Sequence, residues 1–337
     1  MMIDYFSLQT HIQNPLISLL EYYRESELPT QDELLLQSSG PVTDLAQKSF
    51  LPCLESIRIL FFEPHTNKEK KSISELNGDI NLGFNESLII LIQEYKESRW
   101  HTIEEIKSSS LEDAINLTKK WEIPLVIDSE LAIVPGGFTG LLGYDLNRWS
   151  VDIKLENIPF PGTLLGVLWR ADAWWVHDRA LQKLELISIP NHHWIKGARA
   201  NKINLKSPTD SSKLEFFEVT ESESDASHAN KVDRIKNSIR QGHIYQLNYG
   251  RKWEGEMPDH PWYAFQRILE TNPSPFSSWL HVHDHGWSIA SASPERLLKT
   301  KKGIVSTRPI KGTYPRGRSI VEDKRLQLEM SSSEKEI

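Results

Sequence analysis

A lysine, Lys311, lies between Pro309 and Gly312 in the turn-like stretch STRPIKGTYPRG. A turn held by proline and glycine is a place where a functional side chain can be fixed. A lysine amine is nucleophilic only when neutral, and an unperturbed lysine is neutral in about one molecule in 2,500 at pH 7. Nearby cations or burial lower the pKa of a lysine, and Arg308 and Arg316 flank this one. Lys311 is therefore a candidate nucleophile, and a solvated turn lysine is the alternative.

Glu295 is a candidate acid or base because SASPERL places it directly after a proline, between two strand-like segments. Exposed carboxylates are common on protein surfaces. On residue types alone, we therefore favour a surface glutamate that pairs with Arg296 or Lys299.

Three histidines, His281, His283 and His285, alternate in HVHDH. On a strand, a period of two would place them on one face, with Asp284 nearby, as a zinc site requires. However, His285 falls in an apparent DHG turn, so we expect the rings to diverge and favour a solvated strand face. The single cysteine, Cys53, cannot form an internal disulfide, and one cysteine is too few for a thiolate-built metal site.

The composition is that of a globular protein, and the single cysteine fits a reduced, cytoplasmic setting. The chain has 337 residues, of which 39% are hydrophobic, which is enough for one large domain or two ordinary ones. The formal net charge of −7 argues against nucleic acid or an anionic membrane as partner. The N-terminal residues lack a basic region and a long apolar run, so we expect no secretory signal, and no apolar stretch is long enough to span a membrane.

Hydrophobic spacing predicts a chain of mixed strands and helices. We expect strands at 34–40, 56–62 and 243–253, a β-hairpin over 162–189, and three or four antiparallel strands over 277–310. We expect helices at 111–123, from a cap at Ser227 to Gly242, at 261–270, and near the C-terminus. The glycines of GGFTGLLG do not match a dinucleotide motif and predict close strand packing or a tight turn.

A polar, acidic and serine-rich stretch, Ser207–Asn230, predicts a linker or a long surface loop. We place a boundary near residue 225. This divides the chain into an N-terminal region, 1–225, and a second region, 226–337.

Four segments in order, HIYQLNYGRKW, NPSPF, SASPERL and TRPIKGTYPRG, resemble the chorismate-utilising enzymes. This family includes anthranilate synthase component I, aminodeoxychorismate synthase component I, isochorismate synthase and salicylate synthase. GGFTGLLGYDLNRW is similar to the N-terminal part of the first two. The resemblance covers most of residues 130–337 and implies an α/β fold, with two antiparallel sheets packed face to face and helices outside.

The resemblance also implies a mechanism, because aminodeoxychorismate synthases typically have lysine at the Lys311 position and anthranilate synthases have alanine. The amine of Lys311 would attack C2 of chorismate while the C4 hydroxyl departs. Ammonia from a partner glutaminase subunit would then add at C4 and expel the lysine. Hydroxide is a poor leaving group, so Glu295, 16 residues earlier, becomes the expected general acid. The backbone of Gly312 and Thr313 would line the substrate site.

Members of the family usually need Mg²⁺ to hold a substrate carboxylate. The chain ends at SSSEKEI, which resembles the approach to the family's AEN segment, and a later TGAPK segment is absent. We therefore expect a C-terminally truncated catalytic region, with the metal ligands beyond Ile337 and no activity for the chain alone. Anthranilate synthase component I is the alternative function. A catalytically dead remnant that binds a glutaminase or tryptophan is another.

The N-terminal domain of the family can bind tryptophan. The resemblance places such a site at Ser38, Pro273 and Phe276, although Gln37 replaces the glutamate of the regulated pattern.

Overall fold

The computed structural model describes residues 3–25, 32–64, 87–125, 131, 133–151, 157–200, 205, 218–310 and 314–332. The chain divides into two compact units. The first comprises residues 1–208 and 272–337, and the second comprises residues 209–271. The domain boundary near residue 225, between regions 1–225 and 226–337, stays a prediction.

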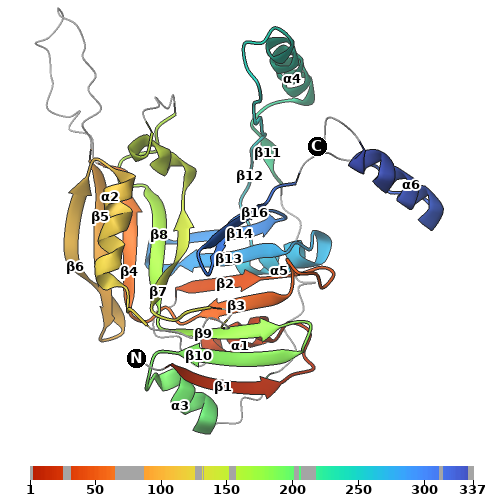
Figure 1. Ribbon diagram of the computed structural model, residues 1–337. Coiled ribbons are helices and arrows are strands. Elements are labelled where there is room, and N and C mark those ends of the chain that lie inside the picture. The colour runs from red at the N-terminus through yellow and green to blue at the C-terminus, as the bar shows by residue number, and fades with distance from the viewer. Residues whose placement is uncertain are drawn as a thin grey trace, which may run out of the picture. The chain divides into compact units, whose positions relative to one another are not determined.

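A seven-stranded antiparallel sheet forms one layer of the first unit (Figure 1). Its order is β1 (Asp4–Gln9), β10 (Lys183–Ser188), β9 (Ala173–Asp178), β3 (Lys48–Pro52), β2 (Glu33–Gln37), β13 (Phe276–Val282) and β14 (Trp287–Ser293). Helix α1 (Pro15–Glu25) contacts β3 and β9, and α3 (His193–Ala200) contacts β1 and β10. Residues from both ends of the chain therefore share one sheet.

A five-stranded antiparallel sheet forms the second layer, in the order β6 (Arg99–Ser108), β5 (Leu88–Lys96), β4 (Ile57–Phe62), β8 (Leu164–Ala171) and β7 (Gly137–Leu142). An apolar cluster that includes Ile59, Ile90, Ala114 and Trp149 covers one of its faces. This cluster joins the sheet to helix α2 (Leu111–Thr118), which Ser110 caps and the short η2 (Lys119–Trp121) extends, and to η3 (Tyr144–Trp149). The helix predicted at 111–123 is confirmed.

The two sheets pack face to face through a second buried cluster. Leu34 and Leu280 belong to the seven-stranded sheet, whereas Leu60, Val167 and Trp169 belong to the five-stranded sheet, and all five side chains are at most 3% exposed. Burial of apolar surface is the main force that holds such layers together. The α/β fold class with two packed antiparallel sheets is confirmed.

Residues 162–178, predicted as one arm of a hairpin, contain two strands, β8 and β9, which belong to different sheets. The chain leaves β8 at Ala171, bends at Asp172, and enters β9 of the other sheet. Arg170 Nε donates to Asp172 Oδ1 at 2.8 Å beside this bend. The sequence does not show the change of sheet because both strands are largely buried and read as one apolar run. The hairpin of β9 with β10 is confirmed.

The glycine-rich segment packs closely against β8, as the sequence predicted. Gly140 has φ +155°, and a Cβ atom there would lie 2.0 Å from the backbone oxygen of Val167. A Cβ atom at Gly143 would lie 2.4 Å from the backbone oxygen of Leu165. No side chain fits at either distance, so both positions require glycine.

The last part of the first unit forms a separate two-stranded sheet of β15 (Arg296–Lys301) and β16 (Ile304–Arg308), followed by helix α6 (Ile320–Ser331). With β13, the 3-10 turn η5 (His283–His285) and β14, these elements confirm the strands and the final helix that the sequence predicted. No helix among the described residues is long and apolar enough to cross a membrane.

The second unit contains α4 (Asp225–Arg240), α5 (Pro261–Thr271) and a short sheet of β11 (Thr220–Glu221) and β12 (Trp253–Glu254). The helix predicted at 261–270 is confirmed as α5. The predicted linker 207–230 is wrong over its last six residues, because α4 begins at Asp225. Its cap is Ser224, whose hydroxyl accepts from Ser227 N–H, and not Ser227 itself. Residues 207–217 lie outside the described residues.

The strand predicted at 243–253 is wrong. Within the described chain, only the last residue of this segment, Trp253, pairs with another strand, and Tyr245 is 91% exposed. Alternating residues make a strand only where a neighbouring strand accepts their backbone hydrogen bonds.

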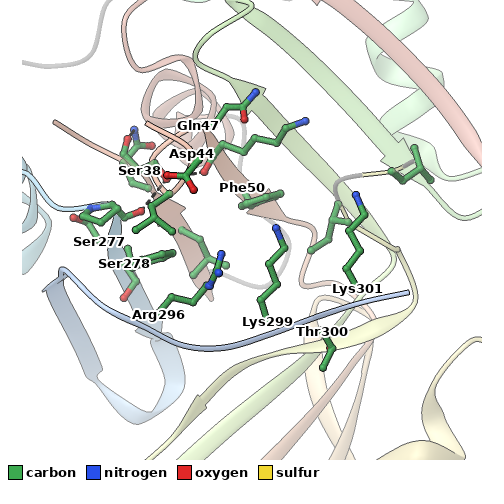
Figure 2. A pocket seen from close by; sticks show the side chains of 18 of the residues that line it. Ser38, Asp44, Gln47, Phe50, Ser277, Ser278, Arg296, Lys299, Thr300 and Lys301 are labelled. Carbon is green, nitrogen blue, oxygen red and sulfur yellow. Dashed lines mark hydrogen bonds between the residues drawn. The ribbon is translucent and has the colours of Figure 1, made fainter. Parts of the chain in front are cut away.

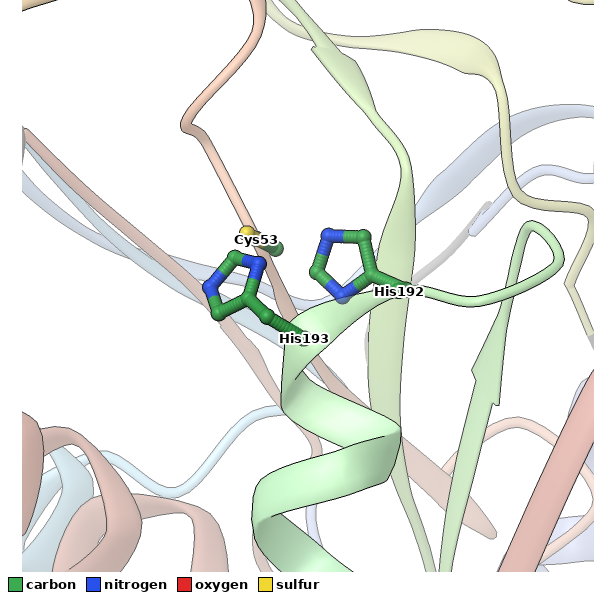
Figure 3. A group of neighbouring side chains, drawn as sticks. All are labelled: Cys53, His192 and His193. Carbon is green, nitrogen blue, oxygen red and sulfur yellow. The ribbon is translucent and has the colours of Figure 1, made fainter.

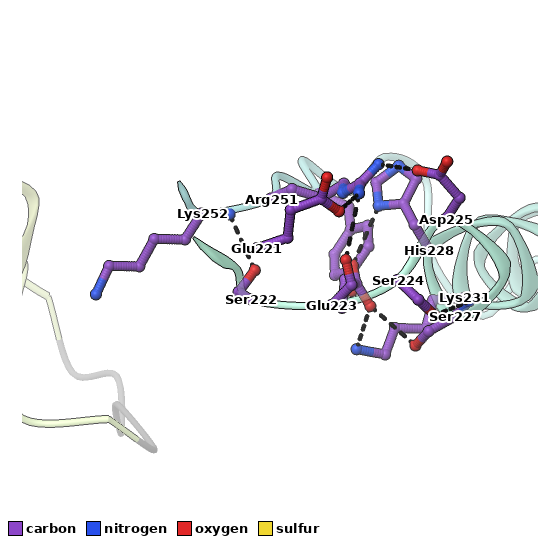
Figure 4. Close-up of polar contacts among 11 residues, drawn as sticks. Glu221, Ser222, Glu223, Ser224, Asp225, Ser227, His228, Lys231, Arg251 and Lys252 are labelled. Atoms are coloured by element: carbon purple, nitrogen blue, oxygen red, sulfur yellow. Dashed lines mark hydrogen bonds and ion pairs between the residues drawn. The ribbon is translucent and has the colours of Figure 1, made fainter. Parts of the chain in front are cut away.

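A polar cluster joins the start of α4 to residues 249–251 (Figure 4). The carboxylate of Glu223 accepts from Tyr249 Oη at 2.5 Å and pairs with Lys231 Nζ at 2.7 Å. The hydrogen bonds from Lys231 and then Tyr249 lower the pKa of Glu223 to about 2. Arg251 pairs with Asp225 at 2.7 Å. These contacts are exposed. They connect the start of α4 to residues 249–251 by polar interactions and do not form an apolar core.

Candidate functional site

The expected catalytic residues lie around the hairpin of β15 and β16. Glu295 is exposed and directly precedes β15, and its backbone oxygen accepts from Ser293 Oγ at 3.4 Å. Lys311, Gly312 and Thr313 lie outside the described residues. Their roles, and the pairing of Lys311 with Glu295, stay predictions.

The hairpin register brings the two relevant segments side by side. Arg296, which follows Glu295, pairs with Arg308, which lies three positions before Lys311. Arg308 Nη2 contacts Asp44 Oδ2 at 2.7 Å, so the same strand end is also tied to the loop between β2 and β3. The chain therefore returns to the neighbourhood of Glu295 immediately before it reaches the PIKGT motif.

A pocket of about 960 Å³ opens between this hairpin and the seven-stranded sheet (Figure 2). Its apolar wall includes Leu36, Phe50, Leu131, Ile133 and Phe276. Figure 2 shows Arg296, Lys299 and Lys301 on the hairpin side of the pocket. Several other labelled polar groups come from the end of β2, the loop after it and β13. An apolar wall with a charged rim suits a small molecule that carries both an aromatic part and an anionic group.

Two of the three residues predicted to bind tryptophan meet at this pocket. Ser38 and Phe276 both line it, together with Pro275. Ser38 Oγ donates to Pro275 O at 2.9 Å, and Ser39 N–H donates to Ser274 O at 3.0 Å. Pro273 is not among the lining residues. Segments 237 positions apart in sequence therefore share one wall of the pocket.

The cations of the pocket rim are functional candidates that sequence reasoning missed. Arg296, Lys299, Lys301 and Lys302 line it from β15 and the turn after it. Arg296 and Lys299 differ by three positions, which on a regular strand would place them on opposite faces. The register shifts between these two residues, as in a β-bulge, and they therefore reach the same pocket. The basic residues of RLLKTKK were the available signal. Strict strand alternation, however, assigns Arg296 and Lys299 to opposite faces and so does not predict that they line one pocket.

The described residues do not form the Mg²⁺ site that the family resemblance implies. Among the ranges that the structure covers, one group of three metal-ligating side chains converges, namely Cys53, His192 and His193. Its sulfur and nitrogen atoms are poor ligands for Mg²⁺, which prefers oxygen. The expectation that the Mg²⁺ ligands lie beyond Ile337 stays a prediction.

The alternating histidines do not share one strand face. His281 lies on β13 with its Nδ1 2.8 Å from Ser288 Oγ, whereas His283 and His285 lie in η5. The ring of His285 contacts Phe62, with ring centroids 5.4 Å apart. The divergence expected from the DHG turn holds for His285, whereas the rings of His281 and His283 stay close, with centroids 5.8 Å apart. Among the described residues, these histidines do not belong to a converging group of three metal ligands.

Comparison with known families identifies the chain. The model of the chorismate binding enzyme family matches residues 60–337. The chain therefore belongs to the chorismate binding enzymes.

Its curated relatives carry two kinds of name. The chain is 29% identical over 208 residues to aminodeoxychorismate synthase component 1 of Salmonella typhimurium, covering 60% of this chain and 43% of that protein. It is 30% identical over 226 residues to anthranilate synthase component 1 of Acetivibrio thermocellus, covering 60% of this chain and 44% of that protein. The chain thus spans less than half the length of these relatives.

Among solved structures, the chain resembles anthranilate synthase component I from Streptococcus pneumoniae, with a TM-score of 0.57 and 19% identity. The match covers 98% of this chain and 65% of the other. At this identity, the likeness establishes the fold and leaves the reaction open.

Proposed function

We propose that the chain belongs to the chorismate-aminating subunit of aminodeoxychorismate synthase. This subunit would convert chorismate and ammonia to 4-amino-4-deoxychorismate, a precursor of p-aminobenzoate and folate, with ammonia from a glutaminase partner. The observation that carries the proposal is the lysine of the PIKGT motif, Lys311, within a member of the chorismate binding enzymes. The name of the Salmonella relative agrees with this choice.

The proposed reaction needs two groups: a neutral amine that attacks the ring, and an acid that protonates the departing hydroxyl. Lys311 would form a bond to C2 as the C4–O bond breaks and the ring double bonds shift. A proton from Glu295 would convert the departing hydroxide to water. Ammonia would then form the C4–N bond, and the electrons would return to break the bond between C2 and the lysine. The register that pairs Arg296 with Arg308 supports a close approach of the two segments.

The test is the product made by the protein translated from the whole reading frame that encodes this chain. With chorismate, ammonium and Mg²⁺, we expect 4-amino-4-deoxychorismate, and Lys311→Ala should lower kcat at least about 10³-fold because the covalent step is lost. Lys324→Ala, at an exposed position of α6, is the matched control and should leave kcat unchanged. Anthranilate as product, made equally fast by Lys311→Ala, would establish the alternative reaction.

A second candidate function is tryptophan binding in the pocket. It rests on the meeting of Ser38 and Phe276 at one apolar and cationic cavity. L-Tryptophan should raise the melting temperature of the chain, and Phe276→Ala should abolish the shift. Phe160→Ala, which removes a side chain that is 87% exposed and outside the pocket, should preserve it. An unchanged melting temperature for the unsubstituted chain at millimolar tryptophan would refute this candidate.

A further inference from the structure

The end of strand β3 and the start of helix α3 bring three potential metal ligands together: a cysteine and, 139 and 140 positions later in the sequence, two adjacent histidines (Figure 3). They are the thiol of Cys53 and the imidazoles of His192 and His193, and one ligand atom from each lies within 4.8 Å of the other two. Figure 3 shows both rings beside Cys53, with a nitrogen of His193 turned toward the cysteine. We propose that these three side chains bind a Zn²⁺ ion.

The surrounding backbone holds this group in place. Cys53 N–H donates to Ala173 O at 2.8 Å, which continues the pairing of β3 with β9 beyond Pro52. Asn191, at φ +62°, ends the turn before the histidines, and its N–H donates to Asp4 Oδ2 at 2.7 Å. The cysteine and the histidines are therefore positioned by hydrogen bonds that do not depend on a metal.

Each histidine has one nitrogen engaged by a protein partner. Nδ1 of His192 accepts from Trp194 N–H at 3.2 Å, and Trp194 stacks on Tyr23 with ring centroids 4.7 Å apart. Nε2 of His193 lies 3.0 Å from Oε2 of Glu55. A carboxylate that accepts a proton from one ring nitrogen orients the ring and strengthens the other nitrogen as a ligand, as in many zinc sites. This leaves Nε2 of His192 and Nδ1 of His193 as the metal-binding atoms.

The charges and chemical types at the cluster favour Zn²⁺ over Mg²⁺ or Ca²⁺. Zinc takes cysteine sulfur and histidine nitrogen in tetrahedral sites, whereas the hard cations require oxygen. On binding, the sulfur–zinc bond replaces the S–H bond, and one proton is released to solvent.

The site needs only a small adjustment to close around the ion. Tetrahedral bonds of about 2.3 Å to sulfur and about 2.0 Å to nitrogen place ligand atoms about 3.5 Å apart. The side chain of His193 is 60% exposed and can rotate toward Cys53, which is itself 1% exposed. A water molecule would occupy the fourth position, while Glu55 keeps its contact with Nε2 of His193.

The experiment titrates the metal-free 337-residue chain with Zn²⁺ in competition with a chromophoric chelator. We expect one equivalent to bind, and His193→Ala should weaken binding at least about 100-fold, because one of three protein ligands is lost. This variant keeps its fold, since the side chain is mostly exposed. His11→Ala is the matched control, at an exposed histidine beyond the opposite end of β1 from the cluster, and should bind as the unsubstituted chain does.

Co²⁺ substitution identifies the sulfur ligand independently of folding energies. The unsubstituted chain and His11→Ala should show a thiolate-to-cobalt charge-transfer band, and Cys53→Ser should lack it. The proposal is wrong if the folded chain binds no zinc, if His193→Ala binds it equally well, or if the cobalt complex has no thiolate band. Because the readout is metal binding, it is independent of the proposed amination of chorismate.

Discussion

Nη1 of Arg58 donates to Oδ2 of Asp32 at 2.9 Å, and both side chains are at most 1% exposed. Asp32 also accepts from Trp169 Nε1 at 2.9 Å and from His283 N–H at 3.0 Å, and Arg58 pairs with Asp284. Arg58 lies on β4 of one sheet, and its partners lie beside β2 and β13 of the other. This buried ion pair therefore links the two sheets beside the apolar cluster that includes Leu34, Leu60 and Trp169.

Removing the guanidinium should strongly destabilise the chain. Arg58→Met leaves Asp32 buried without its cation, and we expect the free energy of unfolding to fall by about 3–5 kcal/mol. Urea unfolding measures the loss. The matched control is Arg308→Met, which breaks an exposed pair with Asp44 and should cost less than about 1 kcal/mol. Adding Asp32→Asn to Arg58→Met should recover part of the loss. Equal losses in the two single variants would contradict a buried, desolvated pair.

Stability should fall in mild acid because of His177. Its side chain is buried on β9, and within the described structure neither ring nitrogen has a hydrogen-bond partner. Burial, aided by Arg179, lowers its pKa from 6.5 to about 4, while Asp178 opposes this. Between these values, the unfolded chain binds a proton that the folded chain does not. The contribution of His177 to the free energy of unfolding is therefore fully present above pH 6.5, and it decreases by about 3 kcal/mol as the pH falls to 4.

The variant His177→Leu removes this titration and should reduce the pH dependence of unfolding between pH 6.5 and 4, while the half-buried ring of His192, whose pKa is lowered to the same extent, maintains the remainder. His11→Leu, at an exposed position, should retain the slope of the unsubstituted chain. Thermal unfolding across this range makes the comparison, and parallel slopes for all three proteins would show that His177 is not the titrating group.

The close approach of β7 and β8 predicts different outcomes for two glycines on the same strand. Gly140→Ala would place a methyl group 2.0 Å from Val167 O at φ +155°, and we expect it to cost at least about 3 kcal/mol. Gly137→Ala meets no atom within 4 Å and should change stability by less than about 1 kcal/mol. Urea midpoints of the two variants test this directly. A stable Gly140→Ala chain would mean that the strands can separate locally.

The proposed acid role of Glu295 gives a separate prediction for the protein translated from the whole reading frame. Glu295→Gln keeps the size of the side chain and removes the proton, so kcat for 4-amino-4-deoxychorismate should fall about 10²–10⁴-fold, with little change in KM. Glu329→Gln, on the exposed face of α6 where it pairs with Arg325, should have no effect. An unaltered kcat in Glu295→Gln would show that another group protonates the departing hydroxyl.

Local patterns predicted most of the elements and one edge of the site. The strands around Leu34–Gln37 and Ile57–Phe62, the helices at 111 and 261, and the C-terminal hairpin all follow from apolar spacing and turn residues. The errors occurred where a distant partner decides the outcome. Residues 243–252 alternate like a strand, but no strand of the described chain pairs with them. The run 162–178 divides between two sheets at Asp172. Neither fact is encoded within the segment itself.

The sequence by itself determined the family, because the order of several motifs and the lysine of PIKGT require no coordinates to recognise. Tertiary structure decided which distant residues meet. It placed Ser38 beside Pro275, Arg58 beside Asp32, and Cys53 beside His192 and His193. The residues of a motif are adjacent in sequence and can be recognised without a structure. The contacts named above join residues that are distant in sequence, so they form only when the two sheets and their loops pack. For this reason the single cysteine, dismissed as too few for a thiolate-built metal site, becomes a candidate zinc ligand.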